Sequence, residues 1–172
     1  MLVRQLTRFD ASSFVSLRLA GLKECPASFA SSYEEEAGRS LHDVEKQLAA
    51  ERGEGVFGSF DETRLVGVAG LGRKHPRKLS HKAFVWGVYV APEMRGRGIS
   101  RALIVELIRF AQLRPDITQI NLTVNAKNEL ALRLYKSLGF EPFGIERNSL
   151  LVDGCFHDEV HMSLQMDRRT AS

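Results

Sequence analysis

The pattern of apolar and polar residues changes its period once, in the middle of the chain. Every residue from Phe84 to Val90 except Gly87 is apolar or aromatic, which is typical of a strand buried on both faces. A basic, glycine-rich stretch at 95–98 follows. After it, apolar residues recur at intervals of three and four, as on one face of a helix. The members of this face are Ile99, Leu103, Ile104, Leu107, Ile108 and Ala111. The stretch 84–111 is therefore predicted to be a strand, a turn and a helix.

The same two periods predict the other elements. The expected strands are 2–6, 56–60, 65–71, 82–90, 117–124, 142–151 and 155–164. Helices are expected after Asp10 and after Ser40, each of which can cap a helix, and at 128–138, where Gly139 ends the helix in a left-handed conformation. A turn at 153–154 should join the last two strands.

The turn at 95–98 has the features of an anion site. The first turn of a helix carries unpaired N–H groups and the positive end of the helix dipole. Gly96 and Gly98 let a bulky phosphate approach the backbone, and Arg95 and Arg97 add positive charge. A tight turn with solvated arginines is the alternative interpretation. The position of this turn between a buried strand and a helix favours a phosphate ligand, and a diphosphate is the expected one.

Residues 88–103 resemble the acetyl-CoA signature of the GNAT superfamily of N-acetyltransferases, whose core is Gln/Arg-x-x-Gly-x-Gly/Ala. Arg95 and Gly98 match this core, whereas Ser100 stands where Gly or Ala is usual. Serine is small and keeps its N–H, so we expect the departure to be tolerated.

A second stretch, 125–140, resembles the segment Asn-x-x-Ala-x-x-x-Tyr-x-x-x-Gly-Phe of the same superfamily. The matching residues are Asn128, Ala131, Tyr135, Gly139 and Phe140. Two motifs in the family's order make a chance resemblance improbable. They cover the middle and C-terminal half of the chain, while the N-terminal third agrees by length and pattern alone.

The resemblance implies an α/β (α+β) fold of the GNAT acyltransferase type, with a mixed, mainly antiparallel sheet of about six to seven strands flanked by about four helices. No repeat or linker divides the chain, so residues 1–166 are expected to form a single domain, followed by a loose tail at 167–172. The implied cosubstrate is acetyl-CoA, and no metal is expected. The implied cofactor-binding residues are Val88, Tyr89, Val90, Arg95, Gly96, Arg97, Gly98, Ile99, Ser100, Arg101 and Asn128.

The central strand is expected to hold the pantetheine arm through its backbone. Val88 and Val90 can offer N–H and C=O groups if the strand is bulged or splayed near Gly87. The N–H of Val88 or a neighbour can also polarise the thioester carbonyl and stabilise the oxyanion that develops there. A plain core strand is the alternative interpretation, and both can hold together. Asn128 is expected to cap its helix and, by the resemblance, to bind the pantetheine arm.

By the resemblance, the hydroxyl of Tyr135 is the general acid that protonates the CoA thiolate. Tyr135 follows Asn128 by two helical turns, so the two side chains can point in the same direction. A phenol with a reference pKa of about 10 stays protonated at neutral pH and can donate as the sulfur gains charge. The alternative is a packed aromatic residue whose hydroxyl only positions the sulfur.

The base that deprotonates the acceptor is not evident from the sequence. An alkyl amine with a pKa of about 10.4 is mostly protonated at pH 7, and uncovering its neutral form costs about 4 to 5 kcal/mol. Several members of the family place a glutamate on the central strand for this task, but residues 83–87 contain no carboxylate. The remaining candidates are Glu34, Glu35, Glu36, His81, His157 and Asp158.

The acceptor is the least defined part of the prediction. In this fold the segment between the first two helices usually borders the acceptor pocket, so the implied substrate contacts are Phe29, Tyr33 and Glu34. The expected reaction is transfer of an acetyl group from acetyl-CoA to a primary amine, with a small molecule as the first choice of acceptor. A protein N-terminus or lysine side chain is the second choice. A non-catalytic acetyl-CoA-binding sensor is the alternative from another class.

Composition narrows the class of protein further. The 172 residues, 44% hydrophobic and 26% charged, suit one soluble domain. The sequence has no run of membrane-spanning length and begins without the apolar core of a signal peptide, so a cytoplasmic protein is expected. Cys25 and Cys155 are too few for a disulfide framework or a metal site. Nucleic acid is not an expected partner, because the densest basic group, at 73–82, lacks interleaved aromatic residues. Dimers are common in the family, so a homodimer is compatible with the resemblance.

Overall fold

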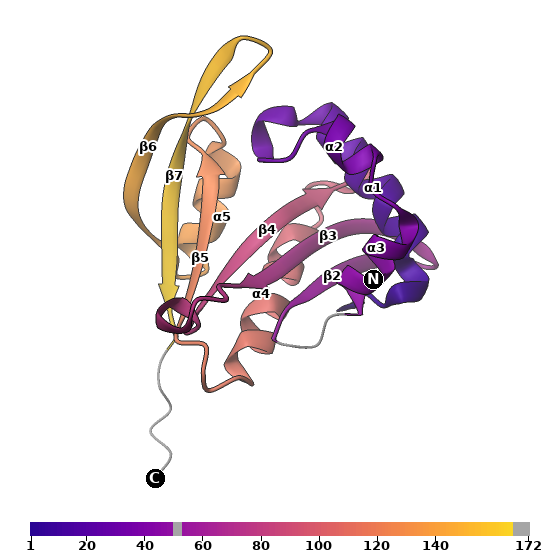
Figure 1. Ribbon diagram of the computed structural model, residues 1–172, viewed down its shortest axis with the longest axis horizontal. Coiled ribbons are helices and arrows are strands. Elements are labelled where there is room, and N and C mark those ends of the chain that lie inside the picture. Colours follow the sequence, from indigo (N-terminus) through magenta and orange to yellow (C-terminus); the bar gives the residue numbers. More distant parts are fainter. Residues whose placement is uncertain (50–52, 167–172) are drawn as a thin grey trace.

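A sheet of seven strands in the order β1-β2-β3-β4-β5-β7-β6 runs through the computed structural model, which describes residues 1–49 and 53–166 (Figure 1). The strands are β1 (Leu2–Gln5), β2 (Gly55–Asp61), β3 (Arg64–Arg73), β4 (Lys82–Val90), β5 (Gln119–Asn125), β6 (Glu141–Val152) and β7 (Cys155–Gln165). β4 and β5 pair in parallel, and all other neighbours in the sheet pair antiparallel. The predicted mixed, mainly antiparallel sheet is confirmed.

The described residues form five α-helices, which lie on both faces of the sheet (Figure 1). They are α1 (Ala11–Glu24), α2 (Tyr33–Ala37), α3 (Leu41–Leu48), α4 (Ile99–Gln112) and α5 (Glu129–Ser137). Four 3-10 turns accompany them, at Arg8–Asp10, Pro26–Ser28, Arg77–Leu79 and Pro92–Met94. α4 and α5 lie behind the sheet in Figure 1, and α1, α2 and α3 lie on its other side.

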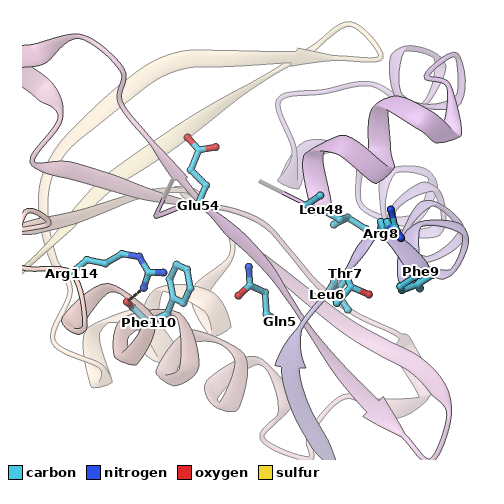
Figure 2. Close-up of a pocket in the computed structure, with 10 residues that line it drawn as sticks. Gln5, Leu6, Thr7, Arg8, Phe9, Leu48, Glu54, Phe110 and Arg114 are labelled. Carbon is cyan, nitrogen blue, oxygen red and sulfur yellow. Dashed lines mark hydrogen bonds between the residues drawn. The ribbon is translucent and has the colours of Figure 1, made fainter. Parts of the chain in front are cut away.

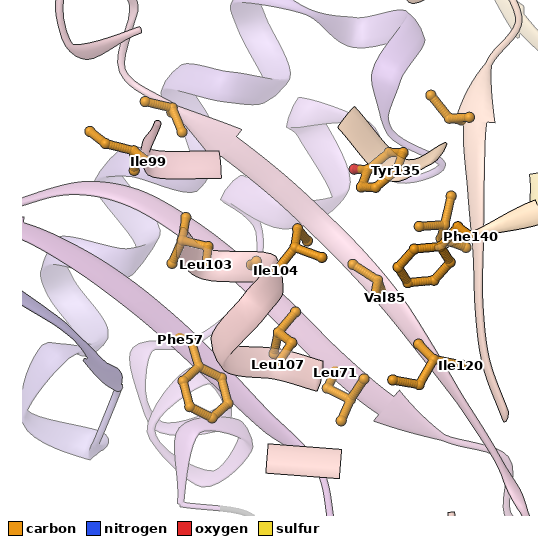
Figure 3. Packing of buried hydrophobic residues seen from close by; sticks show 14 of the residues in the cluster. Phe57, Leu71, Val85, Ile99, Leu103, Ile104, Leu107, Ile120, Tyr135 and Phe140 are labelled. Atoms are coloured by element: carbon orange, nitrogen blue, oxygen red, sulfur yellow. The ribbon is translucent and has the colours of Figure 1, made fainter. Parts of the chain in front are cut away.

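The larger apolar cluster fills the face covered by α4 (Figure 3). Leu103, Ile104 and Leu107 are completely buried there, as the three- and four-residue spacing predicted. Burying each of these side chains contributes about 1.5–3 kcal/mol to folding. The helix lies close to the sheet because β3 offers Gly67, where an added Cβ would come within 2.9 Å of the Ile99 side chain.

A second apolar cluster fills the face covered by α1 and α3, and it includes Phe14 and Leu22. Side chains of β4 divide between the two faces, as expected for a strand in the middle of a sheet. Val85 and Val90 belong to the larger cluster, whereas Tyr89 belongs to the second. β4 is therefore the element around which both halves of the core are built.

α1 starts directly after Asp10, as predicted, but the Asp10 side chain does not bond to the helix. Asp10 directly precedes the helix, but its carboxylate turns back and accepts hydrogen bonds from the Arg4 guanidinium and the Thr7 N–H, both at 2.8 Å. Thr7 and Asp10 form a capping box around the short turn Arg8–Asp10. Asp10 thus closes the preceding turn and does not cap α1.

The other predicted ends are confirmed. Ser40 caps α3 by accepting the Asp43 N–H at 3.1 Å, and Gly139 follows α5 with a φ of 91°. Asp153 and Gly154, with φ values of 49° and 76°, join β6 to β7 as a tight hairpin. The predicted tail, 167–172, lies outside the described residues. Within those residues, no helix is both long enough and apolar enough to span a membrane.

Candidate functional site

The sheet opens between β4 and β5. The two strands pair from Lys82 opposite Gln119 to Phe84 opposite Asn121, and they then separate while β4 continues to Val90. Figure 1 shows them diverging from their common end. Peptide groups on the facing edges are thereby left without ladder partners, so they can bond to a ligand inserted between the strands.

β4 is also bulged on its other side. Tyr89 pairs with Val68 and Trp86 pairs with Gly70, so the two residues between, Gly87 and Val88, face only one residue of β3. Gly87 has a φ of 64°, a conformation that glycine adopts without strain. The sequence-based expectation that this strand is bulged or splayed near Gly87 is confirmed on both edges.

The glycine-rich turn connects β4 to the start of α4. Gly96 and Gly98 have φ values of 75° and 76°, and Gly98 is the residue that precedes the helix. A Cβ built on either glycine meets no described atom within 4 Å, so the backbone lies open to a ligand. Ser100 is half-buried in the first turn, and Arg97 is exposed beside the glycines. Open backbone, unpaired first-turn N–H groups and an exposed cation fit a diphosphate.

Two other residues predicted to bind the cofactor have structural contacts. Ile99 is buried in the larger apolar cluster. Arg101 donates to the Ser137 hydroxyl and so ties α4 to α5. Their contacts fix the position of the first turn of α4.

Arg95 lies in the glycine turn and also bonds to the end of β4. Its Nε donates to the carbonyl oxygen of Val90 at 3.0 Å, and its Nη2 donates to Glu24 at 2.9 Å. The same carboxylate oxygen of Glu24 accepts the Tyr89 hydroxyl at 2.6 Å. Burial and the bond to Glu24 raise the pKa of Tyr89 to about 12. The charge of Arg95 is thus shared with Glu24, a partner that the sequence analysis did not identify.

Asn128 and Tyr135 lie on α5. The Asn128 side chain caps the helix by accepting the Ala131 N–H at 3.1 Å, as predicted. Tyr135 is 7% exposed, and its ring packs edge-on against Phe140 at a centroid distance of 5.9 Å. Its hydroxyl points away from Phe140 (Figure 3). Burial raises the pKa of Tyr135 to about 12, which keeps the phenol protonated across the physiological range.

The predicted substrate contacts fall in different environments. Phe29 is buried, Tyr33 is half-buried beneath the Lys23 ammonium at 4.3 Å from its ring, and Glu34 is exposed. The sequence analysis missed Arg18, which lies on the buried face of α1, 6% exposed, with its guanidinium carbon 4.7 Å from the Phe29 ring centre. A charged residue four positions after Phe14, on the apolar face of the helix, was the signal that could have identified it.

The residues predicted as candidate bases also lie in different parts of the fold. His81 precedes β4 at the end of the strand remote from Gly87, and its carbonyl oxygen accepts the Thr118 N–H at 3.0 Å. Asp158 accepts hydrogen bonds from the Asn148 N–H and the Arg147 guanidinium, and these bonds together lower the pKa of its carboxyl.

His157 and Glu36 have contacts closer to the open part of the sheet. The Nδ1 atom of His157 lies 3.3 Å from the amide nitrogen of Asn125, the last residue of β5. That amide also donates to the carbonyl oxygen of Ala27 at 3.0 Å, in the segment that leads to Phe29. Glu36 pairs with Arg18 at 3.4 Å. Glu35 caps its own helix through the Ser32 N–H at 2.8 Å.

A family model described as acetyltransferase (GNAT) family matches residues 22–140, more than half of the chain. The chain belongs to this family. The match includes the bulge of β4, the glycine turn and both ends of α5. The GNAT resemblance of the two sequence motifs is confirmed.

Curated GNAT relatives match over part of their length. The N-alpha-acetyltransferase RimI of Mycobacterium tuberculosis is 40% identical, over 52% of this chain and 54% of the relative. The L-amino acid N-acetyltransferase AaaT of Escherichia coli is 32% identical, over 53% of this chain and 55% of the relative. The chain thus spans about half the length of these relatives.

Solved structures match over almost the whole GNAT fold. Ribosomal-protein-alanine N-acetyltransferase from Brucella melitensis is 25% identical with a TM-score of 0.81, covering 96% of this chain and 100% of the other. The protein yncA from Salmonella typhimurium, solved with its cofactor acetyl-CoA, is 21% identical with a TM-score of 0.82, covering 100% of this chain and 97% of the other. The second likeness shows the fold alone.

A hollow of about 540 Å³ lies elsewhere on the GNAT domain (Figure 2). It is lined by Gln5, Leu6, Thr7, Arg8, Phe9, Leu48, Ala49, Glu54, Phe110 and Arg114. Arg114 follows the end of α4, a 14-residue helix, so it lies about 20 Å from the glycine turn along the helix axis. The hollow is therefore separate from the bulge of β4, and we assign the candidate site to the bulge and the glycine turn.

Proposed function

We propose that the protein transfers an acetyl group from acetyl-CoA to a primary amine of a small molecule. The observation that carries this proposal is the geometry of β4, which is bulged at Gly87, separated from β5 and continuous with the glycine turn. One strand thereby offers a backbone edge for a slender amide-bearing arm and leads to a site for its phosphates. Membership of the GNAT family, whose members use acetyl-CoA, supports this assignment.

The residues that would hold acetyl-CoA divide into two groups. The N–H groups at the start of α4, with the exposed Arg97, would bind the diphosphate. The backbone of Val88 and Val90 would bind the pantetheine arm, while Arg95 keeps the end of β4 in place through its bond to the Val90 carbonyl. Asn128, at the start of α5, would contribute a further hydrogen bond from the other side of the opening.

The transfer forms a C–N bond and breaks a C–S bond. The acceptor amine loses one proton, and the departing CoA sulfur gains one. The Val88 N–H would stabilise the negative charge that develops on the carbonyl oxygen. Tyr135 would donate a hydrogen bond, and then its proton, to the sulfur. Burial raises the pKa of Tyr135 to about 12, so the phenol would keep its proton until negative charge develops on the sulfur.

The names of two relatives support two kinds of acceptor. A relative from Escherichia coli is named as an L-amino acid N-acetyltransferase, which supports a small amine. The relative from Mycobacterium tuberculosis is named as an N-alpha-acetyltransferase, so a protein N-terminus is the second candidate. Among the candidate bases, we propose His157, because Asn125 links it to the segment that leads to Phe29.

The test is release of free CoA thiol from acetyl-CoA, measured with four kinds of acceptor. These are amino acids, polyamines and aminoglycosides, xenobiotic amines, and peptides with a free N-terminus or lysine. We expect turnover with one class of small amine and a loss of turnover, but not of acetyl-CoA binding, in Tyr135→Phe. Turnover confined to peptides would replace the small-molecule proposal. Acetyl-CoA binding without any turnover would support a sensor.

A further inference from the structure

Arg18 is a buried cation on the face of α1 that packs against the sheet. Its neighbours on that face, Phe14 and Leu22, belong to the second apolar cluster. Burying a guanidinium among apolar side chains is costly unless its charge and its N–H groups are matched. A buried guanidinium such as that of Arg18 is therefore expected to have binding partners.

Two aromatic rings and one carboxylate lie next to the Arg18 guanidinium. The Arg18 guanidinium lies 4.7 Å from the ring centre of Phe29 and 5.9 Å from that of Trp86. Its Nη2 atom reaches Glu36 at 3.4 Å, at the long end of the range for a hydrogen bond. Glu36 also pairs with Arg39 at 3.2 Å, so its charge is divided between two arginines. Two cations and one anion leave this group with an excess of one positive charge.

The rest of the guanidinium has no partner among the described residues. Both Nε and Nη1 of Arg18 are buried and without a hydrogen-bond acceptor. Together they carry three of the five N–H donors of an arginine side chain. Nη1 lies 3.3 Å from the position that a Cβ on Gly87 would occupy. The two unsatisfied donors of Nη1 therefore lie beside the bulge of β4, where the proposed acetyl transfer takes place.

We infer that Arg18 binds an anionic group of the acceptor, and that the acceptor is consequently a small amine bearing a carboxylate, such as an amino acid. This inference rests on the proposed function, because it places the acceptor amine at the bulge. A carboxylate supplies both the negative charge and the acceptor oxygens that the guanidinium lacks. Trp86 and Phe29 hold the guanidinium in place, so little conformational freedom is lost when the carboxylate binds.

The arrangement of β4 agrees with an anionic acceptor. The strand has no carboxylate between Ala83 and Val90 that would repel one. Gly87 has no side chain, so Nη1 can lie against the backbone of β4, only 3.3 Å from the position of an added Cβ. α2, which carries Glu36, has five residues, none of them buried. Nε and Nη1 are buried in the structure, so binding would require a neighbour of Arg18, such as Glu36 of this short helix, to move aside.

The experiment compares matched acceptors on wild type and variants. For each L-amino acid, the carboxamide and the amine without the carboxyl group are measured alongside it, for binding by calorimetry in saturating CoA and for turnover with acetyl-CoA. We expect wild type to prefer at least one free amino acid over its carboxamide by about tenfold to a hundredfold. Arg18→Met, which keeps an apolar side chain of similar length, should abolish that preference while leaving the carboxamide unaffected.

Two further variants keep the result interpretable. Arg18→Lys retains the charge and should restore part of the preference, and Arg39→Met, which removes the other arginine paired with Glu36, should retain it. Equal binding of acids and carboxamides by wild type, or equal losses for both in Arg18→Met, would overturn the inference. Carboxylate-dependent binding without turnover would uphold the inference and count against the proposed function. Turnover confined to amines that lack a carboxylate would overturn the inference and support the proposed function.

Discussion

The hydroxyl of Tyr89 donates to the carboxylate of Glu24 over 2.6 Å, which joins the end of α1 to the strand just beyond the bulge of β4. The same carboxylate accepts from Arg95, which in turn holds the carbonyl of Val90. One acidic side chain thus fixes the strand end from which the glycine turn begins.

Removing the Tyr89 hydroxyl should loosen this connection. Tyr89→Phe is expected to lower the free energy of unfolding by about 1 kcal/mol, because the bond involves a charged but partly solvated partner. It should also raise the KM for acetyl-CoA several-fold, because Glu24, which bonds to Arg95, is then no longer held in place by Tyr89. Urea unfolding and initial rates measure the two effects. Glu24→Gln should give the same change in KM, and an unaltered KM in both variants would contradict the predicted connection.

Replacing Tyr135 tests the chemical step. Tyr135→Phe should lower kcat by about a hundredfold, with little change in acetyl-CoA affinity, because the ring still packs against Phe140 while the proton donor is lost. Since burial raises the pKa of Tyr135 to about 12, the wild-type rate should not decline through Tyr135 ionisation up to about pH 10. A falling limb near pH 10 that disappears in Tyr135→Phe would show an ordinary, exposed phenol instead.

The glycine turn should be intolerant of side chains for reasons of conformation. Gly98→Ala places a Cβ on a residue with a φ of 76°, which costs about 1–2 kcal/mol of stability. It should also weaken acetyl-CoA binding, because the methyl group stands where a phosphate would approach. Gly144→Ala is the matched control, since a Cβ there also meets no described atom within 4 Å but its φ is not positive. Thermal unfolding and calorimetry should separate the two variants, and equal behaviour would argue against the strained turn.

Asp10 should make stability depend on acidic pH. Bonding to Arg4, together with bonds from Thr7, lowers the pKa of Asp10 from 3.8 to about 2. Because the folded pKa is the lower one, the contribution is complete above about pH 4 and disappears as the pH falls towards 2. Arg4 is 40% exposed, so solvent screening limits the contribution to about 1 kcal/mol. The stability difference between wild type and Asp10→Asn should therefore shrink from pH 6 to pH 2 in urea titrations, and a constant difference would refute this assignment.

Local patterns sufficed to predict the elements of the site. The change from strand to helix period located α4, and Gly87, Gly96 and Gly98 marked three positions that adopt a positive φ. These features depend on neighbouring residues in the chain, so one sequence reveals them. Asp10 was placed correctly before α1, but the partner of its carboxylate was not predicted, because an aspartate there can bond equally well to the helix or to Thr7.

Contacts between distant segments were beyond the sequence. Glu24 and Arg95 are 71 positions apart, and no local spacing indicates that they meet. Arg18 had a local signal, a cation on an apolar helix face, but its proximity to Gly87 depends on how α1 lies across the sheet. The missing acidic residue on β4 was visible in the sequence, whereas the buried cation facing that strand became apparent only with the fold.

The separation of β4 and β5 also bears on how the sheet avoids unwanted association. Exposed strand edges attract other chains, and proteins usually protect them at the rim of a sheet. Here two edges face each other in the interior, held together at one end by the pairs from Lys82 to Phe84. Because these pairs hold the two strands together at one end, another protein's strand could reach the facing edges only between β4 and β5, beyond Phe84. The unpaired edges are therefore protected by their position between two strands of the same sheet, and a ligand that bonded to them would extend the hydrogen bonding of that sheet.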